Sequence, residues 1–361
     1  MFLAWKEILF NKSRYLLIIG VLVLVSYLVY FLTVLAYGLA QDNRTSIDKW
    51  QADAIVLSDE ANSTINMSMV ETSALSAIQG ADAIAKLGQQ PVVLTSNPDT
   101  DAEDKISSTI FGVEADNFLA PNIIEGNLFS DDFEAVADIS LQEEYGLAIG
   151  DELPLSIIDK RITIVGFTDE AKFNVAPVLY TNLSTYQTIR SLANPNAPDI
   201  VSAFVIRTDD PDKISLSDDS LTLYPINEFI NNLPGYSAQV LTFSFMIIFL
   251  VVIASIVIGI FMYVLTVQKI DVFGVMKAQG IPTSFIGTSV VGQTFILASL
   301  GSGIGLSLTI ITAYFLPTSV PFAINPLYFA IITGITISFA ILGSLFSVGV
   351  IAKISPLQAI G

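Results

Sequence analysis

The fold is decided by the stretch Leu16–Leu35, LLIIGVLVLVSYLVYFLTVL, which contains no charged residue. A helix of about 20 apolar residues crosses the hydrocarbon core of a bilayer, which is roughly 30 Å thick. Comparable apolar runs follow at 238–267, 283–316 and 327–352. The sequence therefore predicts four transmembrane helices, the first at 15–38.

The composition agrees with a membrane protein and excludes several kinds of catalytic site. Hydrophobic residues make up 52% of the 361 residues and charged residues only 14%, whereas about a quarter is charged in soluble proteins. The chain has no cysteine and no histidine, which excludes disulfides, thiol nucleophiles, Cys/His zinc sites and Ser-His-Asp triads. The net charge of −18 disfavours nucleic acid as a partner, because phosphate binding needs clustered Lys and Arg. Hydrolytic catalysis would need carboxylates alone, and the adjacent pairs Glu143/Glu144 and Asp131/Asp132 are poor acid/base couples because neighbouring side chains point apart. We predict no catalytic residue, metal or intrinsic cofactor.

Basic residues near the predicted helix ends indicate the orientation in the membrane. They are Lys6, Lys12, Arg14, Lys269, Lys277 and Lys353. Because such bases mark the cytoplasmic side, we expect both termini in the cytoplasm and the segment 39–237 outside, with the chain in the plasma membrane. The outer segment keeps 32 of the 34 acidic residues and has a net charge of −22.

The outer segment contains β-branched runs bounded by turn residues, which predict strands at 153–157, 161–167, 177–180, 201–206 and 221–224. Helical spacing at 141–147 and 183–192 predicts two helices between them. The predicted fold class is thus a polytopic α-helical membrane protein with four transmembrane helices and a large α+β extracytoplasmic domain between the first and second.

The remaining segments are short. They are a cytoplasmic interfacial helix at 1–14, a cytoplasmic helix at 268–282, an outer loop at 317–326 and a cytoplasmic tail at 353–361. For 1–14, an ordinary start of the first long helix is an equal alternative to an interfacial helix with an aromatic anchor.

The cytoplasmic segment 268–282, QKIDVFGVMKAQGIP, predicts a short helix that ends at Gly280 and Pro282. Ile270, Phe273 and Met276 repeat at helical spacing and form one apolar face. No soluble domain is expected nearby to cover this face, so it predicts a partner protein that receives the helix in a groove. A helix that lies on the bilayer is the alternative.

The spans indicate tight packing and an external source of energy. Gly301 and Gly305 form a GxxxG pair in the third span, which permits close helix contact. No span contains an ionisable Asp, Glu, Lys or Arg, which disfavours an ion-coupled carrier. No G-x-x-x-x-G-K-[ST] loop occurs in the chain, so a separate subunit must bind and hydrolyse ATP.

Val264–Gly280, VLTVQKIDVFGVMKAQG, resembles the coupling segment of the FtsX/MacB class of ABC-transporter permeases, marked by Ile-Gly-Val-Leu-Lys-Ala-Leu-Gly. Pro356–Gly361 resembles the class's closing Pro-x-Glu-Ala-Ile-Gly, with Gln358 in place of the acid. The resemblance covers the membrane region and implies a non-catalytic permease that pairs with a second copy of itself and with two ATPase subunits. The residues expected to couple to the ATPase are Lys269, Ile270, Asp271, Phe273, Gly274, Met276, Lys277 and Gly280.

Within that class, three stretches resemble the haem-efflux permeases and their DevC-like relatives. They are Leu35–Asn43, Tyr263–Ile270 and Leu316–Phe322. The resemblance implies that ATP-driven closure squeezes a membrane-dissolved substrate outward, with haem or another porphyrin as the cargo and a Gram-positive bacterium as the source.

Candidate substrate residues follow from haem chemistry. Without His or Cys, an axial ligand must be Tyr, Met or a carboxylate, and the candidates are Tyr236, Met246, Met67 and Met69, the last two placed to share one side of a strand. Arg44 and Lys49 follow the first span and are candidates for the propionates. The alternatives are an interfacial tyrosine, methionines that fill gaps in a core, and bases paired with Asp42 and Asp48.

Two other functions remain open at this point. The same machinery would serve a lipid, a peptide or an antimicrobial compound. An FtsX-like signal transmitter, whose outer domain activates a cell-wall hydrolase, is the candidate from a different class.

Overall fold

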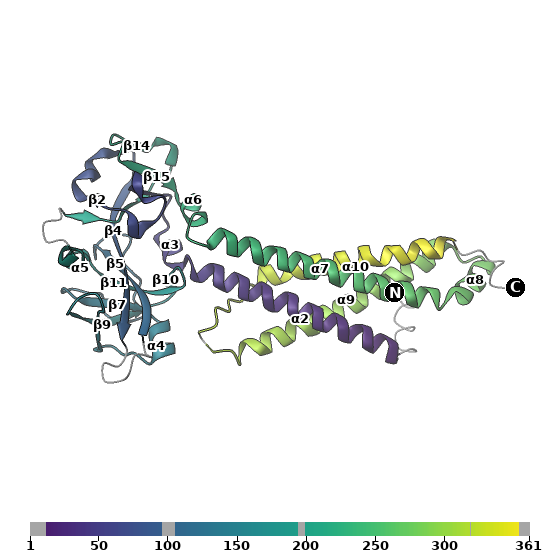
Figure 1. Ribbon diagram of the computed structural model, residues 1–361. Coiled ribbons are helices and arrows are strands. Elements are labelled where there is room, and N and C mark those ends of the chain that lie inside the picture. The colour runs from purple at the N-terminus through teal and green to yellow at the C-terminus, as the bar shows by residue number, and fades with distance from the viewer. Residues whose placement is uncertain (1–11, 96–104, 194–198, 318, 354–361) are drawn as a thin grey trace. The chain divides into compact units, whose positions relative to one another are not determined.

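A computed structural model describes residues 12–95, 105–193, 199–317 and 319–353. The chain divides into two compact units, shown in Figure 1. The membrane unit comprises Met1–Gly38 and Leu241–Gly361, and the α/β domain comprises Leu39–Val240. Most of the predicted interfacial helix at 1–14 and of the tail at 353–361 lies outside the described residues.

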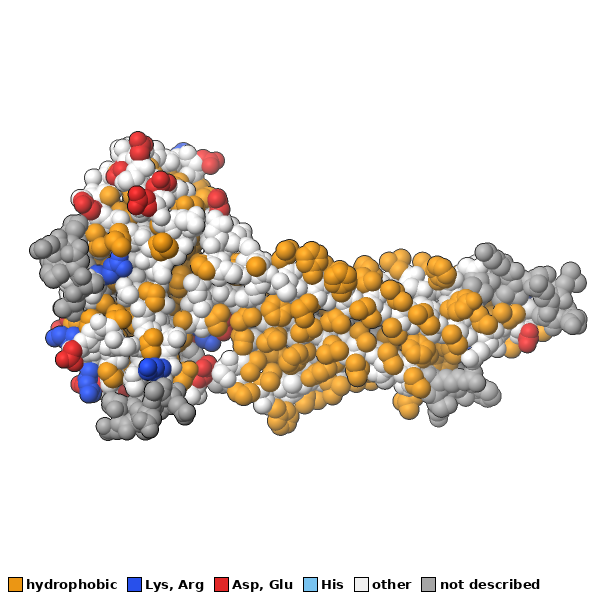
Figure 2. Space-filling model, in the orientation of Figure 1, with side chains coloured by type: hydrophobic (Ala, Val, Ile, Leu, Met, Phe, Trp, Pro, Cys, Tyr) orange, Lys and Arg blue, Asp and Glu red, His pale blue; other side chains and the backbone are white. Residues whose placement is uncertain are grey.

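Four helices in the described ranges are long and apolar enough to cross a membrane. They are α2 (Lys12–Asp42), α7 (Tyr236–Val267), α9 (Thr283–Ala313) and α10 (Pro326–Lys353). Hydrophobic side chains cover the visible face of these helices (Figure 2). The predicted fold class, with a large domain between the first and second spans, is confirmed.

Helix α9 packs closely on α2 through its glycines. A Cβ atom built on Gly301 would lie 2.6 Å from the Cβ of Leu22, and one built on Gly305 would lie 2.8 Å from the backbone nitrogen of Tyr27. Real Cβ atoms do not approach neighbours this closely, so only glycine fits here. The close contact predicted from the GxxxG pair is confirmed, and its partner is the first span.

Tyrosine hydroxyls on α2 add polar contacts within the membrane unit. Tyr15 donates to Oε1 of Gln293 on α9 at 3.1 Å. Tyr30 lies 2.6 Å from the hydroxyl of Thr333 on α10. Side-chain hydrogen bonds between transmembrane helices contribute about 0.6 kcal/mol on average. Nothing in the sequence pattern indicates these pairs, because their members lie far apart along the chain.

The loop 317–326 packs against the end of the first span. A Cβ atom built on Gly38 would lie 2.1 Å from the carbonyl oxygen of Pro321. The ring of Phe322 lies 5.6 Å from that of Phe31. Two of the three stretches that resemble the haem-efflux permeases, Leu35–Asn43 and Leu316–Phe322, therefore contact each other.

Short helices and strands complete the structure. The helices are α3 (Thr45–Trp50), α4 (Ser140–Tyr145), α5 (Leu183–Ala193), α6 (Ile226–Asn231), α8 (Ile270–Ala278) and the 3-10 turns η1 (Asp59–Ala61), η2 (Ile65–Met67), η3 (Thr72–Ala77) and η4 (Pro211–Lys213). The strands are β1 (Ala54–Ser58), β2 (Val70–Glu71), β3 (Ile78–Gln79), β4 (Ala83–Thr95), β5 (Lys105–Val113), β6 (Glu125–Gly126), β7 (Glu134–Asp138), β8 (Glu152–Pro154), β9 (Arg161–Thr168), β10 (Lys172–Phe173), β11 (Ala176–Asn182), β12 (Ile200–Val201), β13 (Ala203–Arg207), β14 (Ser215–Leu216) and β15 (Leu221–Pro225).

A mixed sheet forms the centre of the α/β domain. Its strand order is β15-β1-β13-β4-β5-β11-β7-β9-β6, with β10 paired to β11 and β8 paired to β9. The long strand β4 holds the sheet together, because residues 83–87 pair with β13 and residues 88–95 pair with β5. Tyr186 of α5 packs on Gly88 and Gly112, where any Cβ would overlap its atoms.

The strand predictions at 161–167, 177–180 and 221–224 are confirmed by β9, β11 and β15. The predicted strand 201–206 is divided at Ser202, whose hydroxyl accepts a hydrogen bond from the backbone N–H of Gln89 at 2.9 Å. The residues before Ser202 pair with β2 and those after it pair with β4. The predicted strand 153–157 ends early, because Leu155 forms only an isolated bridge.

Candidate functional site: the α8 segment and the start of the α/β domain

Helix α8 is the short helix predicted between the second and third spans. It begins after Lys269, with Asp271 in its first turn and Lys277 in its last. These charges complement the helix dipole. Gly280, at φ +88°, adopts the left-handed conformation that favours glycine after a helix end.

The apolar face expected to be free for a partner is covered by the chain itself. Phe273 is only 4% exposed and belongs to a cluster that includes Tyr15 and Ile286. Ile270 and Met276 pack against the same cluster. The expectation that this face lies uncovered is therefore wrong, because the membrane helices that flank α8 provide the covering surface.

The opposite side of α8 remains exposed. Val272 is 56% exposed and Val275 is 44% exposed, and Asp271 and Ala278 are exposed beside them. Helical neighbours three and four residues apart share a face, so these side chains form one small surface, which we call the α8 outer face. Sequence inspection missed it because a helix with apolar residues on two sides does not reveal which side packs internally.

A polar cluster fixes the start of α8. Lys269, directly before the helix, lies with its Nζ 3.5 Å from the hydroxyl of Tyr15. Tyr15 is 1% exposed and also donates to Gln293, which is 3% exposed. The residue before α8 therefore contacts Tyr15 of α2 directly and Gln293 of α9 through Tyr15. A displacement of α8 would change the contacts of both helices.

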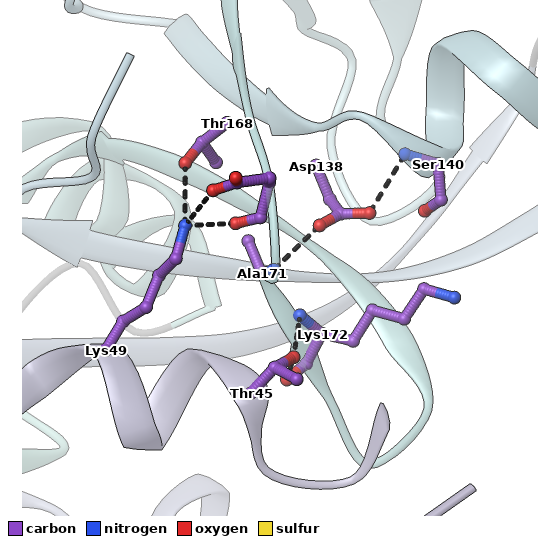
Figure 3. A network of polar contacts seen from close by, with 8 residues as sticks. Thr45, Lys49, Asp138, Ser140, Thr168, Ala171 and Lys172 are labelled. Atoms are coloured by element: carbon purple, nitrogen blue, oxygen red, sulfur yellow. Dashed lines mark hydrogen bonds and ion pairs between the residues drawn. The ribbon is translucent and has the colours of Figure 1, made fainter. Parts of the chain in front are cut away.

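A second polar network lies in the α/β domain (Figure 3). Asp138, only 2% exposed, accepts hydrogen bonds from the backbone N–H groups of Ala171 at 2.8 Å and Ser140 at 3.0 Å. Lys49 of α3 contacts Asp169 and lies 3.4 Å from the Thr168 hydroxyl. The network joins α3 to the turn between β9 and β10.

Lys172 on β10 forms a largely buried ion pair in this region. Its Nζ lies 3.0 Å from Oδ2 of Asp42, and both side chains are less than one-fifth exposed. Although burial by itself would lower the pKa of Lys172, the charges of Asp42, Asp138 and Glu144 together raise it. The side chain therefore stays protonated, and burial raises the pKa of the nearby Glu144.

We expect Lys172→Met to lower the stability of the α/β domain by about 2 kcal/mol, because half-buried Asp42 would lose its cation. A raised folded pKa means that this contribution is fully present below about pH 10.5 and fades only at higher pH. Denaturant unfolding of the full chain, followed by the fluorescence of buried Trp50, measures the loss.

Lys213→Met is the matched control, since its ion pair with Asp210 is exposed. We expect a change below about 0.5 kcal/mol there. Equal effects of the two substitutions would show that the Lys172 pair is an ordinary surface contact.

The structure brings two candidate substrate residues together. Arg44 binds Asp48 through Nε and Nη2, with the shortest distance 2.5 Å. Hydrogen bonds to Asp48 raise the pKa of Arg44, and a hydrogen bond to the hydroxyl of Tyr236 raises it further. Tyr236 is 8% exposed. The prediction that Asp48 pairs with Arg44 is confirmed, whereas Asp42 pairs with Lys172.

The other candidates lie elsewhere. Lys49 is held by Asp169, on the β9–β10 turn. Met67 ends η2 and Met69 follows it, so the expectation that they share one side of a strand is wrong, although both are about 60% exposed. Met246 lies on α7 and is 42% exposed. The described residues contain no group of three or more His, Cys, Asp or Glu side chains that would hold a metal ion.

Comparison with known proteins connects this architecture to a family. Residues 244–356, which include α8 and most of the last three spans, match the family described as FtsX-like permease C-terminal. The membrane part of this chain is an FtsX-like permease domain. The chain is accordingly a multi-pass membrane protein that carries an FtsX-like permease domain.

Curated relatives match over the full length. A putative hemin transport system permease protein HrtB from Staphylococcus haemolyticus is 25% identical over 363 residues, 99% of each chain. The same-named protein of Staphylococcus epidermidis is 25% identical over 372 residues, again 99% of each. An uncharacterized ABC transporter permease of Mycobacterium tuberculosis is 22% identical over 367 residues, 100% of this chain and 99% of that one.

Two solved structures show a distant similarity to part of this chain. The extracellular domain of the noncanonic ABC-type transporter YknZ from Gram-positive bacteria has a TM-score of 0.32 at 12% identity, covering 45% of this chain and 84% of that one. The periplasmic region of MacB from Actinobacillus actinomycetemcomitans also has a TM-score of 0.32, at 9% identity, covering 49% and 89%.

Proposed function

We propose that this FtsX-like permease exports haem or a related porphyrin from the membrane. In this proposal two copies of the chain assemble with two HrtA-like ATPase subunits, which bind ATP on the cytoplasmic side. Both termini and α8 lie in the cytoplasm, and the α/β domain lies outside. ATP-driven closure of the helices squeezes the membrane-dissolved cargo outward.

The observation that carries the proposal is the match to the hemin permeases from end to end. A full-length match includes the α/β domain, which lies outside the FtsX-like match at 244–356. The contact of Gly38 with Pro321 adds support, because it joins Leu35–Asn43 to Leu316–Phe322, two stretches that resemble the haem-efflux permeases.

Tyr236 and Arg44 are the proposed contacts for haem. Tyrosine is an axial ligand in known haem proteins, and the Arg44 guanidinium suits a propionate. Arg44 carries five N–H donors, of which Asp48 takes the one on Nε and one of the two on Nη2. A propionate would therefore share the guanidinium with Asp48.

A haemin titration of the purified chain in nanodiscs, followed by the Soret band, tests the proposal. We expect saturable binding that Tyr236→Phe weakens at least tenfold, because the phenol oxygen is lost and the ring is kept. Tyr263→Phe is the control, since Tyr263 is a 43% exposed tyrosine on the same helix.

Two results would contradict this proposal. Partition of haemin without saturation would remove haem as the cargo and leave lipids, peptides, antimicrobial compounds or signalling to a wall hydrolase. Saturable binding that is identical in Tyr236→Phe and the parent would place the haem site away from Tyr236.

A further inference from the structure

The α/β domain contains a cleft of about 520 Å³ that none of the predicted substrate residues lines. Strands β4 and β5 form one wall through residues such as Gln89, Val93 and Thr109. Phe173 of β10 and Leu233, which follows α6, are also among the residues that line it. A volume of this size is within the range of small-molecule sites in proteins.

The chemistry of the cleft differs from that of the domain around it. Serine, threonine, asparagine and glutamine side chains alternate with proline, aliphatic and aromatic ones, and none of the described residues that line it carries a charge. The surrounding segment has a net charge of −22, yet none of its acidic residues that the structure describes lines the cleft. An uncharged wall favours an uncharged ligand, because an ion would lose its hydration without a partner.

Gln89 lines the cleft with a buried, polar side chain. This residue is 3% exposed, lines the cleft, and its side-chain Oε1 has no hydrogen-bond partner among the described residues. Buried polar atoms in folded proteins are almost always paired. The backbone around it is fixed, because its N–H donates to the Ser202 hydroxyl, which lies 3.0 Å from that of Tyr186.

We propose that this cleft binds an uncharged amphipathic molecule whose N–H or O–H group donates a hydrogen bond to Oε1 of Gln89. Its apolar body would pack against Phe173 and the aliphatic side chains. Haem itself does not fit, because no described cation lines the cleft for the propionates and no tyrosine or methionine lines it for the iron. The site is thus separate from the one proposed at Tyr236.

Saturation-transfer NMR on the full chain in nanodiscs tests this proposal with three indole probes. N-acetyltryptophanamide is neutral and carries amide donors, tryptophol is neutral and carries a hydroxyl, and N-acetyltryptophan is the anion that matches the amide in size. We expect saturable binding of at least one neutral probe and at least tenfold weaker binding of the anion.

Two variants separate this cleft from unspecific binding. Gln89→Leu removes the acceptor and should weaken the neutral probe at least fivefold, while the fold is retained because an apolar side chain replaces an unpaired amide. Ser107→Trp, at an exposed position of β5 that lines the cleft, should block it without disturbing the core. Gln90→Leu is the control, since the neighbouring side chain points to the other face of β4.

The proposal is overturned if all three probes bind equally to the parent. It is also overturned if the neutral probes bind Gln89→Leu and Ser107→Trp as tightly as they bind Gln90→Leu. Neither result depends on whether haemin binds at Tyr236.

Discussion

Phe273→Asp is expected to prevent the chain from accumulating as a folded membrane protein. Phe273 is 4% exposed and packs in an apolar cluster with Tyr15 and Ile286. A carboxylate buried there without a partner costs several kcal/mol, a large part of the stability of a typical protein. The measurement is the yield of monodisperse protein after extraction into detergent, together with its thermal unfolding.

Val272→Asp is the matched change on the exposed side of the same helix. Val272 is 56% exposed, so we expect a normal yield and normal unfolding. On the proposed function, the α8 outer face contacts the ATPase, and a new charge there should lower the ATPase activity stimulated by the permease at least tenfold. Normal yield of Phe273→Asp would contradict the packing of α8, and full stimulation in Val272→Asp would contradict docking on this face.

The comparison of these two positions shows what the sequence determines about α8. The helix itself follows from Asp271 near its start, Gly280 after its end and the spacing of the apolar residues between them. Which apolar face is buried does not follow, because Val272 and Phe273 are both hydrophobic. Only the positions of Tyr15 and Ile286, from two other helices, decide it.

The same limit holds in the α/β domain. Strand β9 was predictable, because Arg161–Thr168 is a β-branched run with clear ends. The Arg44–Asp48 pair was also predictable, since Arg44 directly precedes α3 and Asp48 follows four residues later in its first turn. The ion pair of Asp42 with Lys172 and the cleft beside Gln89 were not, because each brings together residues that lie far apart in the sequence.

Gly305→Leu is expected to disrupt the packing of α9 on α2 with a loss of about 3 kcal/mol. A Cβ at this position would lie 2.8 Å from the backbone nitrogen of Tyr27 and 2.9 Å from the Cβ of Ser26. Backbone atoms of a transmembrane helix cannot rotate away as a flexible side chain can. The two helices would therefore have to separate, which also strains the hydrogen bond between Tyr27 and Thr312.

Gly303→Leu on the same helix isolates this effect from the intrinsic cost of replacing a glycine. A Cβ at Gly303 would meet nothing within 4 Å, and leucine favours a helix over glycine by about 0.8 kcal/mol. We therefore expect unchanged or slightly higher stability for Gly303→Leu and a lower unfolding midpoint for Gly305→Leu in the same detergent. Equal midpoints would mean that α2 and α9 do not depend on close contact, and that the GxxxG pair is incidental to the membrane unit.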